Sequence, residues 1–156
     1  MEKLKKRLFY LFTGELASAC VFTLVYIYFV QAFGTYGSTG LLFSLFILVF
    51  ILIQGGLYWY VKWQVAKGKK QVPGPQFRRI LAAARKVNQI LLIAGAVLIV
   101  AEFIWLDKTV PIALAVTGVY GFAVIEYINY YHVQLTNYRG GRWKRSSIAR
   151  ELGRSR

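Results

Sequence analysis

The chain alternates long apolar stretches with short polar or basic segments. The stretches cover residues 8–33, 41–65, 88–106 and 111–135. An α-helix rises about 1.5 Å per residue, so roughly 20 apolar residues cross the hydrocarbon core of a bilayer. Each stretch reaches or nearly reaches this length. The pattern therefore predicts four membrane-spanning helices.

The connecting segments predict how these helices are arranged. The first two stretches are joined by a short uncharged loop and the last two by residues 107–110, so we expect two antiparallel hairpins. Pro73 and Pro75 stop the second helix, and the third is expected to begin near residue 77 with a basic amphipathic turn. The predicted fold is an all-α integral membrane four-helix bundle. Its transmembrane domain covers residues 1–135, with helices at about 8–33, 41–65, 77–106 and 111–135, and a basic cytoplasmic tail covers 136–156.

The inner end of the fourth span and the tail carry two further local signals. Tyr127, Tyr130 and Tyr131 are expected to form part of an aromatic belt at the membrane surface. In the tail, Ser147 is placed to cap a short helix with Ile148 on one side, and disorder is the alternative.

Charge predicts the orientation of the spans. The net charge of +14, in a chain that is 57% hydrophobic, excludes an ordinary soluble domain. Nineteen of the twenty Lys and Arg residues lie before the first stretch, between residues 62 and 86, or after the fourth stretch, whereas Lys108 lies between the third and fourth. The positive-inside rule then predicts both termini and the middle loop in the cytoplasm, which we take to be that of a bacterium with the protein in its inner membrane.

Anionic lipid headgroups are the expected partners of this charge, because each Lys or Arg near an anionic leaflet gains about 1 kcal/mol. The residues expected to contact headgroups are Arg78, Arg79, Arg85, Lys86, Arg142, Lys144 and Arg145. Nucleic acid is the alternative partner of the tail, but the tail interleaves few aromatic residues with its charges, so we do not expect it. Association with a second copy or with another membrane protein stays open.

Two carboxylates lie deep in the predicted spans. Glu15 lies about 10 Å from the inner end of the first span, and Glu126 about 13 Å from that of the fourth. Since both helices end on the same side, the two lie at similar levels. We predict an intramembrane polar site of Glu15, Gln54, Glu126 and Asn129, which as a buried carboxylate site would carry protons or bind cations. The alternative is a structural role in which each carboxylate pairs with a basic residue at the inner interface, such as Arg85 or Lys86, or hydrogen-bonds tyrosines, and so fixes the register of the helices.

A third carboxylate, Glu102, lies near the outer end of the third span. Water is about one helical turn away, so we expect an interfacial residue within reach of Lys108.

Motifs for catalysis or cofactor binding are missing from the sequence. It contains no catalytic Ser/His/Asp or Cys/His set and no glycine-rich phosphate loop. Its single Cys20 and single His132 do not supply the three or four ligands of a metal site. We therefore expect no enzymatic activity, no cofactor and no metal.

Two family resemblances follow from these residues. Four spans with a carboxylate such as Glu15 in the first are similar to small multidrug resistance transporters, although this chain is longer and its charge fixes one orientation. The segment from Glu126 to Leu135 with its basic tail resembles small bacterial four-helix membrane proteins, sometimes labelled general stress proteins, whose function is unassigned. The second resemblance implies no catalytic residues.

Three functions follow as hypotheses. The first is a non-enzymatic inner-membrane protein that acts by associating with lipid or protein. The second is a small transporter or channel component that uses Glu15 and Glu126. The third is membrane-tethered nucleic-acid binding through the basic tail.

Overall fold

Four long helices and a small C-terminal subdomain follow one another in a computed structural model that describes residues 2–33, 38–69, 73–105, 110–139 and 142–153. The elements are α1 (Glu2–Phe33), α2 (Thr39–Ala66), α3 (Pro75–Trp105), α4 (Val110–Tyr131), β1 (Val133–Arg139), β2 (Arg142–Arg145) and α5 (Ser147–Gly153). The described chain is almost entirely helical, so the predicted all-α class is confirmed at this level.

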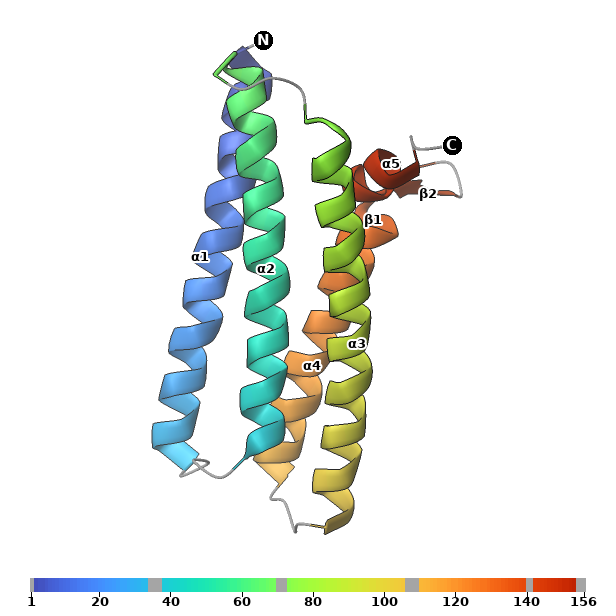
Figure 1. The fold of residues 1–156 in the computed structure, drawn as a ribbon. Coiled ribbons are helices and arrows are strands. Elements are labelled where there is room, and N and C mark those ends of the chain that lie inside the picture. The colour runs from blue at the N-terminus through green and yellow to red at the C-terminus, as the bar shows by residue number, and fades with distance from the viewer. Residues whose placement is uncertain (1, 34–37, 70–72, 106–109, 140–141, 154–156) are drawn as a thin grey trace.

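The long helices lie side by side, and consecutive helices run in opposite directions (Figure 1). All four are long and apolar enough to cross a membrane. Their bounds agree with the expected ones except at the ends. α1 already begins at Glu2, because no Pro or Gly interrupts the residues before the apolar stretch. α2 ends at Ala66, where Gly68 follows with φ +75°, a left-handed conformation that glycine adopts without strain.

α2 is the central helix of the bundle. In the most apolar 18-residue segment of each helix, 56% of the residues of α2 are buried, against 11–22% in the other three helices. Ile47, Leu48 and Ile51 of α2 are completely buried. The other helices keep most of their large apolar side chains on the outside, such as Leu24, Ile93 and Leu114. α2 also has one outward apolar face, which includes Leu42 and Leu57, but the rest of its surface is covered by the neighbouring helices.

The beginning of α2 is capped by two side chains. Ser38 Oγ accepts a hydrogen bond from Leu41 N (3.3 Å), and Glu102 Oε2 of α3 accepts one from Gly40 N (2.7 Å). Glu102 is only 6% exposed. Glu102 lies in the last turn of α3, and its side chain turns inward because the first amides of α2 provide a closer partner than water. Lys108, its expected partner, lies outside the described residues.

The C-terminal part differs most from the prediction. α4 ends at Tyr131 rather than at residue 135, and β1 and β2 form an antiparallel hairpin in which Val133 lies opposite Arg145. The tail is therefore folded in its described part. The pair Gly140-Gly141 between two short segments is a sequence signal of such a hairpin.

The hairpin and α5 are attached to the end of α4. Ser146 Oγ donates a hydrogen bond to the carbonyl oxygen of Tyr130 and accepts one from Ala149 N (3.0 Å). Ser146, not Ser147 as expected, is thus the residue that caps α5. Ile148 of α5 is 2% exposed, and α5 contacts both α3 and α4.

Candidate functional site

A cleft of about 1040 Å³ lies at the end of the bundle that holds the N-terminus and α5. Residues of α1, α2, α4, β1, β2 and α5 line it. Farther along the bundle, the rings of Phe22 and Phe122 meet with their centroids 5.5 Å apart and join α1 to α4. The cleft therefore occupies the part of the bundle between this aromatic contact and the C-terminal subdomain.

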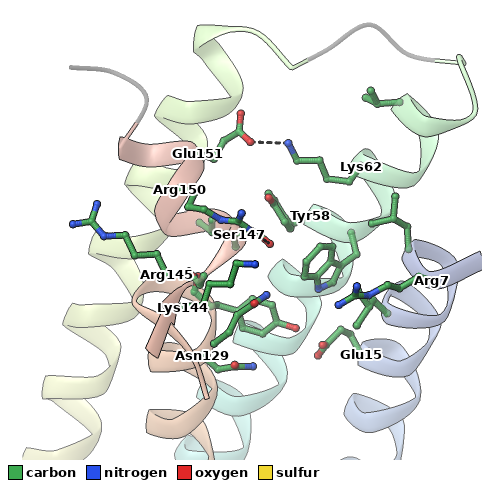
Figure 2. A pocket seen from close by; sticks show the side chains of 18 of the residues that line it. Arg7, Glu15, Tyr58, Lys62, Asn129, Lys144, Arg145, Ser147, Arg150 and Glu151 are labelled. Atoms are coloured by element: carbon green, nitrogen blue, oxygen red, sulfur yellow. Dashed lines mark hydrogen bonds and ion pairs between the residues drawn. The ribbon is translucent and has the colours of Figure 1, made fainter. Parts of the chain in front are cut away.

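Basic side chains surround the cleft, and they come from four elements. These residues are Arg7 of α1, Lys62 of α2, Lys144 and Arg145 of β2, and Arg150 of α5. They converge because α1 begins, α2 ends and α4 continues into β1 at the same end of the bundle (Figure 1). In Figure 2 Lys144 extends into the cleft, whereas Arg145 points away from it. We call this group the basic mouth.

One ion pair closes part of the basic mouth. Lys62 Nζ lies 2.6 Å from Glu151 Oε2, and the two side chains are 25% and 11% exposed. This contact joins the end of α2 to α5 (Figure 2). It neutralises Lys62 and leaves Arg7, Lys144 and Arg150 without an ion pair to a described acidic residue.

The inner part of the cleft is polar and aromatic. Glu15 of α1 and Asn129 and Tyr130 of α4 line it together with Trp59 of α2, whereas Tyr58 lies nearer to Lys62 (Figure 2). Glu15 is half-buried, and Figure 2 shows it with Asn129 below the basic residues. We call Glu15, Trp59, Asn129 and Tyr130 the inner pole. The cleft therefore has a basic end, the basic mouth, and an end with a carboxyl group and aromatic rings, the inner pole.

Tyr130 is the most unusual member of the inner pole. It is 5% exposed, and its hydroxyl makes no hydrogen bond of normal geometry to any described residue, although it lies close to the Glu15 carboxyl and the Trp59 indole. The ring lies against Gly55, where a Cβ atom would collide with it. We had expected Tyr127, Tyr130 and Tyr131 to lie in an aromatic belt, but all three are buried against other helices.

Glu126, as predicted from depth, lies close enough to Glu15 for their charges to interact. Its Oε2 accepts a long hydrogen bond of 3.5 Å from Asn129 Nδ2. Three of the four predicted polar-site residues, Glu15, Glu126 and Asn129, therefore lie together, with Asn129 between the cleft and Glu126.

The fourth predicted residue, Gln54, lies in a separate polar network. It exchanges two hydrogen bonds with Asn88 of α3 (3.1 and 2.8 Å) and accepts one from the Tyr131 hydroxyl (2.8 Å). Gly56, by contrast, lies beside Glu15. Two residues along a helix turn the side chain by about 200°, so Gln54 and Gly56 necessarily face different neighbours.

The predicted headgroup contacts fall in two places. Lys144 and Arg145 are exposed at the basic mouth, and Arg79 and Lys86 are exposed on α3, where Arg78 and Arg85 are half-buried. Arg142 belongs to β2, but its side chain lies outside what the structure describes.

His132 follows α4 directly and meets the ring of Tyr127 edge-on at 5.4 Å. Partial burial and, secondarily, the positive charge of Arg85 lower the pKa of His132 below its usual value of 6.5. Both effects favour the neutral imidazole over the protonated form.

Sequence reasoning did not identify Arg7, Lys62, Arg150 and Glu151 as residues of one site. Each was part of a basic or tail segment, and no local spacing connects them. The described residues contain no group of three or more His, Cys, Asp or Glu side chains that could hold a metal ion. Comparison of the chain with protein families, with curated proteins and with solved structures gives no match.

Proposed function

We propose that the protein is a multi-pass protein of a bacterial inner membrane, with its helices paired as two hairpins and both termini in the cytoplasm. Four apolar helices of spanning length support insertion. The distribution of Lys and Arg supports the orientation, since nineteen of twenty belong to the proposed inner side. The cleft and its basic mouth then face the cytoplasmic leaflet.

This topology is tested by labelling. In a Cys20→Ser background, a Gly74→Cys variant carries its only thiol in an exposed position between α2 and α3. We expect a membrane-impermeant maleimide to label it in inverted vesicles and not in intact spheroplasts. Labelling in spheroplasts would refute the orientation.

Within this membrane, the protein binds the phosphate group of phospholipids in the cleft, without catalysing a reaction. The observation that supports this best is the basic mouth, in which side chains from α1, α2, β2 and α5 surround one cleft. Arg and Lys recognise phosphate through charge-assisted hydrogen bonds. Positive charge spread evenly over the cytoplasmic surface would attract the same lipids. Such a distribution would not bring cations from four elements to one cleft.

The test is the phospholipid retained by the purified protein, measured by native mass spectrometry after mild delipidation. We expect the variant Arg7→Gln/Lys144→Gln/Arg150→Gln to retain several-fold less phospholipid than the wild-type chain. Arg79→Gln/Lys86→Gln, which removes exposed positive charge from α3 and not from the cleft, is the control. Equal loss in both variants would show that only general surface charge attracts lipid.

Proton-linked or cation-linked transport is a second candidate, and it is favoured by one observation: Glu15 lines the cleft and Glu126 lies near it. Glu15→Gln and Glu126→Gln would each abolish such flux in proteoliposomes. Wild-type flux no greater than that of empty vesicles would exclude it.

Nucleic-acid binding by the tail is the third candidate, and it gains no support from the fold. The described tail packs onto the helices through Ile148 and does not extend as a free basic arm.

A further inference from the structure

We propose that the cleft selects a phosphate ester that carries a protonated amine a few atoms away, the chemistry of the phosphoethanolamine headgroup. This inference rests on the proposed binding of phosphate at the basic mouth, and it assigns the inner pole. The phosphate lies among Arg7, Lys144 and Arg150, and the ammonium group points toward Glu15.

The first argument is the charge of the two ends. Lys62 is paired to Glu151 and Arg145 points away from the cleft (Figure 2), so the basic mouth still presents three cations, Arg7, Lys144 and Arg150, and attracts an anionic group. Glu15 is the acidic residue that lines the inner end. A ligand with negative charge alone would bring its anion toward this carboxylate. A ligand that carries an ammonium group at its far end satisfies both poles.

The second argument is the Tyr130 hydroxyl. It is buried beside the Glu15 carboxyl and the Trp59 indole, and its contacts to both depart from normal hydrogen-bond geometry. A buried hydroxyl with poorly formed hydrogen bonds costs free energy, which a better-placed ligand donor would recover. An ammonium group beside Glu15 is a donor to both the carboxylate and the hydroxyl oxygen. The Trp59 indole, which lies near the Tyr130 hydroxyl, adds an aromatic group of the kind that favours an organic cation.

The third argument is the close approach of the inner pole to α2. Gly55 lies against the Tyr130 ring and Gly56 lies near the Glu15 Cβ, so α2 places no side chain of its own at these two positions. The two glycines thereby let the Tyr130 ring and the Glu15 side chain lie against the α2 backbone.

The experiment uses the wild-type chain with a series of lipids. Nanodiscs containing phosphatidylethanolamine, its N,N-dimethyl derivative, phosphatidylcholine or phosphatidylglycerol present the same phosphate with different termini. We expect native mass spectrometry to give the order ethanolamine, dimethylethanolamine, choline, glycerol, with about tenfold preference for ethanolamine over glycerol, because hydrogen bonds to charged groups are worth about that factor. Competition by soluble glycerophosphoethanolamine would identify a free ester as the ligand; failure of this competition identifies the lipid.

The variant Glu15→Gln should lower the retention of phosphatidylethanolamine to about that of phosphatidylglycerol, because it removes the carboxylate that receives the ammonium group. Glu2→Gln, which removes an exposed carboxylate of the same helix away from the cleft, is the matched control and should keep the preference. Equal binding of all four lipids by the wild-type chain would overturn this inference and leave phosphate binding intact. Loss of any dependence on Arg7, Lys144 and Arg150 would instead overturn the proposed function.

Discussion

The adjacent glycines at positions 55 and 56 should respond in opposite directions to the same substitution. Both are buried in α2. A Cβ atom at Gly55 would collide with the ring and hydroxyl of Tyr130, whereas one at Gly56 would lie 3.5 Å from the Glu15 Cβ, which is ordinary van der Waals contact. The two sites share one helix and one depth, so they form a matched pair.

The magnitude follows from two opposing contributions. Alanine in place of glycine stabilises a helix by about 1 kcal/mol, and this gain applies equally at both positions. Forcing extra atoms into a packed site costs about 1–3 kcal/mol. Tyr130 cannot easily move away, because it is 5% exposed and its carbonyl oxygen holds Ser146. Gly55→Ala should therefore be less stable than Gly56→Ala by about 1–3 kcal/mol, since the helix contribution cancels in the comparison.

Thermal unfolding in one detergent, followed by circular dichroism, measures this difference. A free energy of 1 kcal/mol corresponds to about 2–4 °C in Tm for a chain of this size. We expect Tm to fall in Gly55→Ala and to stay level or rise in Gly56→Ala. Tyr130→Leu should recover most of the loss in the Gly55→Ala background. A Gly55→Ala protein at least as stable as Gly56→Ala would refute the packing described here.

Three further predictions concern contacts at the ends of the bundle. Glu102→Gln should lower Tm by about 2–4 °C, because a charged cap on a helix N-terminus is worth about 1 kcal/mol; an unchanged Tm would contradict the capping role. Lys62→Met should lower the free energy of unfolding by about 1–2 kcal/mol, a value between those of surface and buried ion pairs. The double variant Lys62→Met/Glu151→Leu should recover much of this loss. Equal stability of the wild type and Lys62→Met would show that the ion pair does not stabilise the fold. His132, the single histidine, should titrate by NMR below its usual pKa, and Arg85→Gln should raise the midpoint. Because the pKa of the folded state is lower than that of the unfolded state, the contribution of His132 to stability is complete above about pH 6.5 and decreases as the pH falls below that value. A midpoint at or above 6.5 would contradict the partial burial of the imidazole.

The long helices could be predicted from the sequence because hydropathy and length are local properties. The level of Glu15 and Glu126 could also be predicted, since counting residues from the helix ends gives depth. Gln54 was assigned to the wrong group because depth does not give direction around a helix. Its partner Asn88 lies on α3, and only the packing of α2 against α3 decides that these two amides meet.

The basic mouth could not be predicted for a different reason. Arg7, Lys144 and Arg150 belong to segments that are far apart in the chain, and their convergence depends on how the C-terminal subdomain folds back onto α4. The signal for β1 and β2 was short, and a two-stranded hairpin is marginally stable without further packing. Its support comes from α5 and Ser146, which no local pattern reveals.

The central position of α2 has a consequence for how this sequence can change over time. Insertion of a single residue in the middle of α2 would rotate everything beyond it by about 100° and disturb its packing against α1, α3 and α4 at once. The outward faces of α1 and α3 carry no such constraint, and one aliphatic residue can replace another there. Divergent descendants of this chain should therefore keep the length and small residues of α2, while the outward faces drift.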